Sequence, residues 1–261
     1  MNQKQNLFSI SLIVLVIWMI IVLGGEILQA GQGSLEDLVT EQIVISLIGA
    51  PLFLFAVITF FKWDKRELGF KIARNWRLLW FPVLFVLIFL GGATASGLPP
   101  TQMIIFALIN SLLVGISEEL MFRGIIFRAA LAQPQLNIWP AIWITSLLFG
   151  GVHSLNGFMT GDFLAALAQA LAAFMSGIWL HAIRLRTKSL YPAMLIHGLW
   201  DFSIFVFATS MASRGVAVQG DVELSLAQQL LLPLMLPLPL FLYGLWLLRG
   251  IGRKDKVEVV A

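Results

Sequence analysis

The sequence contains no cysteine, which excludes disulfide bonds, thiol nucleophiles and thiolate metal sites. It is also poor in charge: charged residues make up 12% of the 261 residues, about half the usual share in soluble domains. The zinc-protease pattern HExxH is absent as well. The net charge is +3, and the charged residues lie mostly between long apolar runs. They therefore indicate loops at a membrane surface and do not indicate a nucleic-acid partner.

Apolar residues make up 59% of the chain, and several long runs of them hold no charge at all. A helix needs about 20 such residues to cross the hydrocarbon core of a bilayer. The sequence therefore predicts an all-α polytopic membrane protein, with residues 1–261 as one integral membrane domain. Eight transmembrane helices are expected, at 7–25, 42–61, 78–96, 102–122, 139–154, 163–183, 189–210 and 226–248.

Some of these spans carry further expectations. The fourth helix is expected to continue past the membrane face to residue 132, and the fifth is short enough to be tilted, broken or sunk within the bundle. Prolines at 233, 237 and 239 predict a kink in the last span. The first run is longer than the apolar core of a signal peptide, which is about 7–15 residues. A retained helix is therefore favoured over cleavage after "LQA" at 28–30.

The charges between the spans predict the orientation. With eight spans, all of the 17 basic residues except Arg214 fall on one side, including Lys4 and the terminal group Arg249, Arg253, Lys254 and Lys256. Because basic loops stay in the cytoplasm, both termini are expected there. The opposite side carries mainly acidic residues: Glu26, Glu36, Asp37, Glu41, Asp162, Asp221 and Glu223.

The basic loop "KWDKRELGFKIARNWR", residues 62–77, mixes positive charges with large apolar side chains. This mixture is typical of an amphipathic helix that lies in the interface of a membrane. We therefore expect a cytoplasmic amphipathic interfacial segment at 62–77. A solvated basic loop is the alternative.

Ionisable residues at membrane depth are costly and indicate function by default. Here they fall in three helices: Glu118, Glu119, Arg123, His153, His197 and Asp201. Each helix shows a pair with i, i+4 spacing, which places both side chains on one face: Glu119 with Arg123, Phe149 with His153, and His197 with Asp201. The third histidine, His181, precedes "AIRLR" and is expected at the membrane interface, outside the site.

Each pair alone has a structural explanation. Glu119 and Arg123 can form a buried ion pair, while a histidine in a helix usually makes an interhelical hydrogen bond. Together, however, three helices would need three independent polar contacts, whereas one polar cavity accounts for all of them. Within such a cavity a carboxylate and a histidine can deprotonate water for attack on an amide. Zinc bound by Glu118, His153 and His197 is also chemically feasible and stays open.

The three motifs also resemble a known family. "EELMFR" at 118–123, "FGGVH" at 149–153 and "HGLWD" at 197–201 occur in the order and spacing of the type II CAAX prenyl endopeptidase and bacteriocin-processing family, also called CPBP or Abi. Residues 101–211 would then be the motif-bearing catalytic core. The resemblance implies an intramembrane glutamate protease that requires no metal.

By this resemblance, Glu118 and His153 activate water, while His197 and Asp201 help to form the oxyanion site. Glu119, Arg123 and Phe149 would support them. The well-studied prenyl endopeptidases usually carry Asn where this chain has Asp201. An ionised aspartate would repel an oxyanion, so Asp201 is expected to be protonated, to position His197, or to indicate a different activity. The i, i+4 spacing favours the positioning role.

The depths of these residues set a condition on the fold. Glu118 is expected near the cytoplasmic end of the fourth span, His197 near the middle of the seventh, and His153 toward the far end of the fifth. Straight perpendicular helices would keep the three apart, so the site requires a tilted or embedded fifth helix.

The overall interpretation is an intramembrane endopeptidase with no required cofactor, acting on a peptide or membrane-protein substrate in a cavity open to the cytoplasm or to lipid. Its other partners are membrane lipids, and a prokaryotic plasma membrane is the expected location. Two other classes remain: a non-catalytic membrane partner, including a bacteriocin-immunity or regulatory protein, and a proton-coupled transporter. A water-filled pocket that joins Glu118 and His153 would favour the peptidase.

Overall fold

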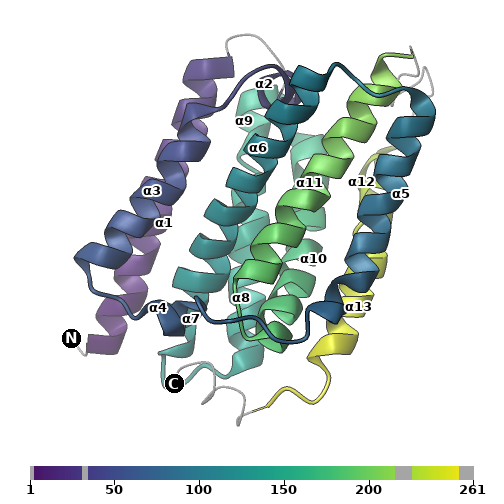
Figure 1. Ribbon diagram of the computed structural model, residues 1–261. Coiled ribbons are helices and arrows are strands. Elements are labelled where there is room, and N and C mark those ends of the chain that lie inside the picture. The colour runs from purple at the N-terminus through teal and green to yellow at the C-terminus, as the bar shows by residue number, and fades with distance from the viewer. Residues whose placement is uncertain (1–2, 31–34, 215–224, 253–261) are drawn as a thin grey trace.

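A computed structural model describes residues 3–30, 35–214 and 225–252, and these residues form helices and no strand. Long helices run up and down in alternation (Figure 1). The first residue of α1 and the last of α13 lie at the same end, called here the lower end, and α2 and α9 lie at the upper end. The helices are α1 (Gln3–Ala30), α2 (Leu35–Glu41), α3 (Ile45–Phe60), α4 (Lys65–Leu68), α5 (Trp80–Ser96), α6 (Thr101–Glu119), α7 (Phe127–Leu131), α8 (Ile138–His153), α9 (Asn156–Thr160), α10 (Phe163–Thr187), α11 (Tyr191–Ala212), α12 (Leu226–Met235) and α13 (Leu238–Leu248).

Six helical segments in the described part of the chain are long and apolar enough to cross a membrane: Leu7–Gln29, Trp76–Ser96, Thr101–Leu131, Ile138–Thr160, Phe163–Thr187 and Tyr191–Ala212. The helices α12 and α13, bent by 53° at their break, count as a seventh if they form one span. The bend agrees with the kink expected from the prolines. Helix α3, with 16 residues, is apolar but shorter than the others. The chain is therefore a helical integral membrane protein with six or seven clear spans.

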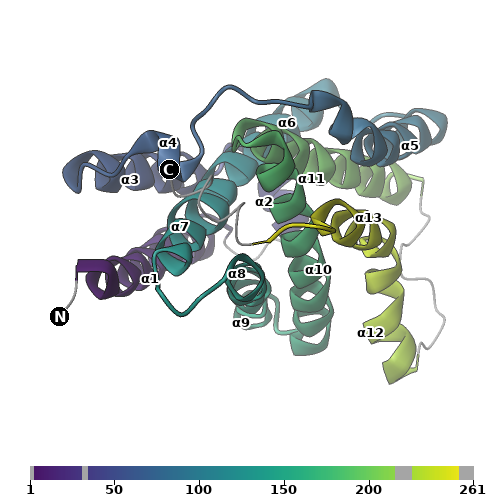
Figure 2. The same ribbon diagram turned by 90° about the horizontal axis from the view of Figure 1, so that it is seen from below.

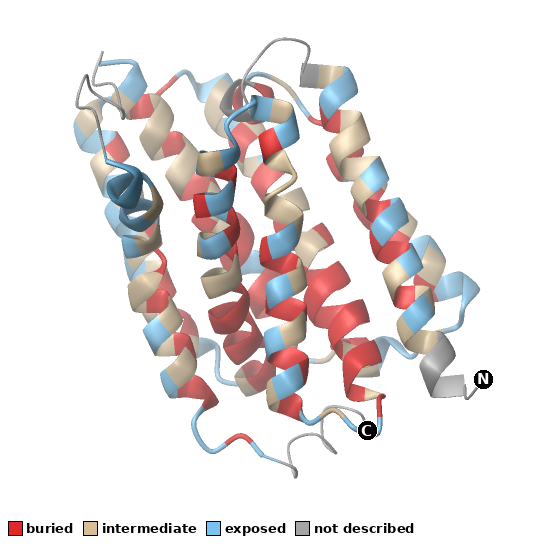
Figure 3. Ribbon diagram, turned by 180° about the vertical axis from the view of Figure 1, so that it is seen from behind, coloured by how far each residue is buried: buried red, intermediate tan, exposed pale blue. Residues whose placement is uncertain are grey.

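The burial pattern fits this class. Large apolar side chains such as Ile20, Leu52, Leu87 and Leu147 point outward, as expected where lipid surrounds a protein. The buried residues gather in the lower half of the bundle (Figure 3). Helix α12 buries no residue and lies at the edge of the bundle (Figure 2).

The fourth predicted span is one continuous helix that ends at Leu131, close to the expected residue 132. Its middle part, Leu120–Ile126, is π-helical and completely buried. Such wide turns are rare and occur frequently at functional sites. Here the π-helical segment follows directly after Glu119.

Helices α6 and α11 cross with almost no space between their backbones. A Cβ atom on Gly115 would lie 2.5 Å from the carbonyl oxygen of Met194, and one on Gly198 would lie 2.8 Å from that of Ser111. Small residues at helix crossings are the usual means of close approach in membranes. This crossing lies just above Glu118 and His197, so it brings their two helices within side-chain reach.

The segment 62–77 does not form the expected continuous helix. It holds only the single turn α4 and the start of a 3₁₀ turn at Trp76–Leu79. Its backbone is tied to the bundle instead, because Arg74 N donates to Thr187 O (2.9 Å) and Leu190 N donates to Gly69 O (2.9 Å). An ion pair between Glu67 and Arg128 adds to these contacts. Binding to the lower ends of α7, α10 and α11 therefore replaces the regular helix.

Some charges used for the orientation lie outside the described residues. They are Asp221, Glu223, Arg253, Lys254 and Lys256. The side chains of Lys4, Glu36 and Asp37 are likewise outside the description.

Candidate active site

The candidate site forms because its three helices begin at different heights. By helix rise, Glu118 lies about 20 Å above Leu131, and His153 lies about 22 Å above the start of α8. Helix α11 starts higher, because Leu190 packs beside Gly124, which lies about 10 Å above Leu131. The rise from the start of α11 to His197 adds about 9 Å. All three residues therefore reach one level. The staggered helix ends, together with the extension of α6 to Leu131, remove the depth conflict expected from the sequence.

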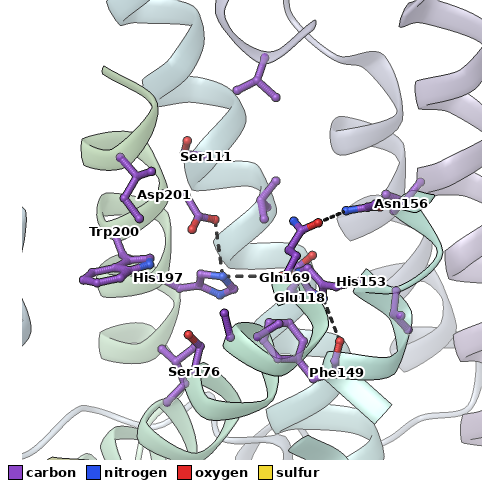
Figure 4. Close-up of a pocket in the computed structure, with 18 of the residues that line it drawn as sticks. Ser111, Glu118, Phe149, His153, Asn156, Gln169, Ser176, His197, Trp200 and Asp201 are labelled. Atoms are coloured by element: carbon purple, nitrogen blue, oxygen red, sulfur yellow. Dashed lines mark hydrogen bonds and ion pairs between the residues drawn. The ribbon is translucent and has the colours of Figure 1, made fainter. Parts of the chain in front are cut away.

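Glu118, His153, His197 and Asp201 line one cavity of about 400 Å³ (Figure 4). The remaining walls are mostly apolar and come from α1, α10 and the α12–α13 bend. A pocket of this size, apolar with a few converging polar groups, is the usual form of a ligand site. The sequence-predicted residues are thus brought together, with Glu119 and Arg123 directly behind them.

Glu119 and Arg123 form a completely buried ion pair, with 2.9 Å between Arg123 Nη1 and Glu119 Oε1. The guanidinium also lies over the ring of Phe149, 4.2 Å from its centre. The expected pair is therefore present, and Phe149 adds a cation–π contact from α8. These three residues fix α6 against α8 behind the cavity.

His197 lies among three carboxylates. Its Nδ1 is 2.8 Å from Glu119 Oε1, and its Nε2 is 3.6 Å from Glu118 Oε2 and 3.5 Å from Asp201 Oδ2. The short contact makes Nδ1–H the donor to Glu119, so Nε2 faces the cavity. Glu119, rather than Asp201, is thus the closer partner that sets the orientation of His197.

His153 is held by its own helix. Its Nδ1 lies 2.8 Å from the carbonyl oxygen of Phe149. Because a carbonyl oxygen only accepts, Nδ1 carries the proton, and a neutral ring then presents a lone pair at Nε2. The ring also packs edge-on against Phe149, with 4.8 Å between centroids. His153 is therefore fixed with an acceptor nitrogen available at the wall of the cavity.

Glu118 has a different environment from its neighbour Glu119. Its Oε2 atom is buried in the cavity wall and has no hydrogen-bond partner among the described residues. Buried polar atoms are normally paired, so an unpaired carboxylate oxygen at a cavity marks a position for water or a ligand. Figure 4 shows Glu118 and His153 at the same side of the cavity, opposite Asp201.

The cavity extends from these residues toward the upper end of the bundle. Below it, Leu120, Met121, Phe122 and Ile126 are completely buried and close the lower end. At the other side, Asn156 Nδ2 donates to the exposed Gln169 Oε1 (2.9 Å) across α9 and α10. The loop charges predict that the lower end is cytoplasmic, and with that orientation the lining residues would mark an opening on the opposite side. The expected openings to the cytoplasm or to lipid stay predictions.

Sequence analysis missed several residues that line the cavity: Glu26, Ser111, Asn156, Gln169 and Trp179. Glu26 was counted with the surface charges, yet it is only 9% exposed and lies inside the first apolar helix. A carboxylate directly after the predicted span 7–25 was the available signal. The other four are ordinary residues of apolar helices and carry no signal of their own.

The expected position of His181 at the membrane interface was wrong, whereas its place outside the site agrees with the cavity lining. His181 is completely buried between α8 and α10, where Nδ1–H donates to Gly177 O (2.7 Å) and Nε2 lies 2.9 Å from Thr145 Oγ1. Phe127 packs edge-on against its ring. Helix α10 reaches well below the site, so a position near its end is still inside the bundle. His181 joins two helices and does not line the cavity.

In the part of the chain that the structure describes, no three His, Asp or Glu side chains are arranged to hold a metal ion. Instead, the three carboxylates surround His197, and His153 is held by the carbonyl oxygen of Phe149. The arrangement supports proton transfer between acids and bases more directly than metal ligation.

Comparison with known proteins finds a similarity in the same segment of the chain that holds the three motifs. Residues 100–203 match the family model described as "Type II CAAX prenyl endopeptidase Rce1-like". Neither the curated proteins nor the solved structures contained a match. The matched segment includes all three motifs and runs from the start of α6 into α11. Over residues 100–203, the chain is therefore similar to the type II CAAX prenyl endopeptidase Rce1-like family.

Proposed function

We propose that the protein is an intramembrane endopeptidase in which Glu118 and His153 activate a water molecule. One observation carries the proposal: Glu118 lines a cavity and its Oε2 has no hydrogen-bond partner among the described residues, while the adjacent Glu119 lies outside the lining with its Oε1 against Arg123 and His197. A purely structural polar contact would pair Glu118 as well. A catalytic carboxylate has to stay free to accept a proton.

The chemistry is a direct attack of water on the scissile carbonyl. Glu118 Oε2 accepts a proton from the water, His153 Nε2 holds the same water, and the water oxygen bonds to the carbonyl carbon. In the second step the C–N bond breaks, and the proton held by Glu118 passes to the leaving amine. No covalent intermediate with the protein is required.

The negative oxygen of the tetrahedral intermediate needs a hydrogen-bond donor. The protonated form of His197 can provide one from Nε2, because its Nδ1–H donates to Glu119 Oε1 at 2.8 Å and fixes the ring toward the cavity. Asp201 lies on this side, 3.5 Å from Nε2. In the protonated state, Asp201 is a second donor, and in the ionised state it opposes the oxyanion.

The test is cleavage of a quenched fluorogenic peptide library by the purified protein, including lipidated peptides. Wild type is compared with Glu118→Gln and with Glu41→Gln, an exposed carboxylate near the upper end that does not line the cavity. We expect activity that a chelator leaves unchanged, that Glu118→Gln abolishes and that Glu41→Gln preserves. Activity lost on chelation would support a zinc enzyme, and equal activity in Glu118→Gln would refute the proposal.

The proposal includes the topology: eight spans, both termini in the cytoplasm of a prokaryotic cell, and 101–211 as the catalytic core. Helix α3 would be the additional span, although its 16 residues rise about 24 Å and the bilayer core is about 30 Å thick. It runs antiparallel to α1 along the length of the bundle, which supports this assignment (Figure 1). Residues 62–77 would then face the cytoplasmic membrane surface.

A further inference from the structure

Glu26 of α1 is a carboxylate that the proposed mechanism does not use, although it lines the same cavity as Glu118. It comes from outside the segment 100–203 that matches the family model. The cavity lining, as far as the structure describes it, includes no Lys or Arg that could neutralise it. A carboxylate at membrane depth without a cation is costly, so its presence requires an explanation.

The geometry directs Glu26 toward the reaction centre. Trp18 Nε1 donates to Ser117 Oγ (2.7 Å), which places Trp18 of α1 level with Ser117 of α6. By helix rise, Glu26 then lies about 12 Å above this level. Because α1 and α6 run in opposite directions and side chains lean toward the N-terminus of their helix, Glu26 leans down and Glu118 leans up (Figure 1). Both carboxylates line the same cavity.

The charges of the cavity are unbalanced. Three carboxylates line it, Glu26, Glu118 and Asp201, with two histidines as the other titratable groups. The nearby Arg123 does not compensate them, because it pairs with Glu119 behind the wall. A ligand with a positive charge would therefore be complementary to this cavity.

A second observation points to the rest of that ligand. Trp179 Nε1 and Ser111 Oγ are buried, lie in residues that line the cavity and have no hydrogen-bond partner among the described residues. Both groups are donors, and the carbonyl oxygens of a peptide are acceptors. Figure 4 shows Ser111 above Asp201, farther from His197 than Asp201 is. The unpaired donors thus match a peptide backbone that passes the catalytic residues.

We propose that Glu26 is a specificity residue that binds an ammonium or guanidinium group of the peptide substrate, while Ser111 and Trp179 donate to its carbonyl groups. The inference rests on the proposed peptidase function and adds the substrate class: a peptide with a positive charge close to the cleaved bond. The charge can come from a Lys or Arg side chain or from a free amino terminus. Either source presents the same cationic hydrogen-bond donors to Glu26.

The first part of the test measures binding. Fluorescein-labelled nonapeptides, each with one Lys at a different position, are paired with otherwise identical peptides that carry norleucine there. Free and acetylated amino termini distinguish the two sources of charge. Anisotropy is measured with the purified full chain carrying Glu118→Gln, so that no cleavage interferes. We expect about tenfold tighter binding of at least one cationic peptide than of its neutral partner.

The second part assigns the preference to Glu26. Adding Glu26→Gln should remove it, Glu26→Lys should transfer it to a matched Glu-containing peptide, and Glu41→Gln should leave it unchanged. A preference that survives Glu26→Gln, or the absence of any cationic preference, would overturn the inference. The same peptides are then given to the Glu118-containing protein. Cleavage without a cationic preference refutes only the role of Glu26, whereas cationic binding without cleavage supports that role and refutes the peptidase.

Discussion

Glu118 and Glu119 are neighbours in the sequence, yet their carboxylates meet different partners. A helix turns about 100° per residue, so adjacent side chains point to different faces. Glu119 turns inward to Arg123 and His197, while Glu118 turns to the cavity. The pattern EExxxR thus places one carboxylate against Arg123 and His197 and the other at the cavity.

Asp201 provides a test of the oxyanion site at the residue scale. Its carboxylate lies 3.5 Å from His197 Nε2, on the side of the cavity where the oxyanion is proposed to form. Asp201→Asn replaces a negative group by an amide donor of the same shape. We expect turnover equal to wild type or raised by up to about tenfold. Steady-state kinetics with one cleaved peptide measure this, with Glu41→Gln as the neutral control. A loss of more than tenfold would mean that the carboxylate itself is required.

Much of the site was predictable at this scale, because ionisable residues in apolar helices are few. The spacing correctly paired Glu119 with Arg123. The partner of His197 was not predictable, since Asp201 at i+4 and Glu119 on another helix compete for the same ring. Sequence spacing reports only contacts within one helix. The choice between helices depends on how closely α6 and α11 approach.

At the scale of elements, two adjacent glycines in α8 make different contacts. A Cβ on Gly150 would lie 2.5 Å from Ala170 O, whereas one on Gly151 would meet no atom within 4 Å. Gly150→Ala should therefore push α8 away from α10 and displace His153. Overpacking of this kind costs about 1–3 kcal/mol.

Gly151→Ala is the matched control, because it adds the same methyl group to the same helix. It should be neutral or stabilising by about 0.5–1 kcal/mol, through its higher helix propensity. Thermal unfolding in detergent and peptide cleavage measure both variants. Equal behaviour of the two would show that the approach of α8 to α10 does not position the site.

The helices were predicted well where apolar runs are long. They were predicted poorly where contacts between distant segments determine the local structure. Helix α6 with its extension to Leu131 and the bend of α12–α13 follow from local pattern. The segment 62–77 has the composition of an amphipathic helix, but its hydrogen bonds to Thr187 and Leu190 hold it in another form. The relative heights of α6, α8 and α11 likewise have no signature in any one of these helices.

At the scale of the whole molecule, the charge distribution predicts the orientation. The natural chain has no cysteine, so a single introduced cysteine reports its own position without background. Lys62 lies exposed at the lower end and Ser213 lies exposed at the upper end. A membrane-impermeant maleimide should label Ser213→Cys in intact cells and Lys62→Cys only after lysis. The reverse pattern would place the termini outside and the cavity entrance toward the cytoplasm.

The central claim is that Glu118 acts as the base and that Glu119 supports the fold, and one paired measurement tests it. Glu118→Gln and Glu119→Gln are compared with wild type for peptide turnover and for thermal unfolding in the same detergent. Glu118→Gln should lower kcat by about 10²–10⁴-fold without loss of stability, because it removes the base while glutamine keeps an oxygen for the 3.6 Å contact with His197 Nε2. Glu119→Gln should destabilise the fold by about 3 kcal/mol, because it leaves Arg123 buried without its counter-charge. Retained turnover in Glu118→Gln, or unfolding of that variant at a clearly lower temperature, would contradict the account.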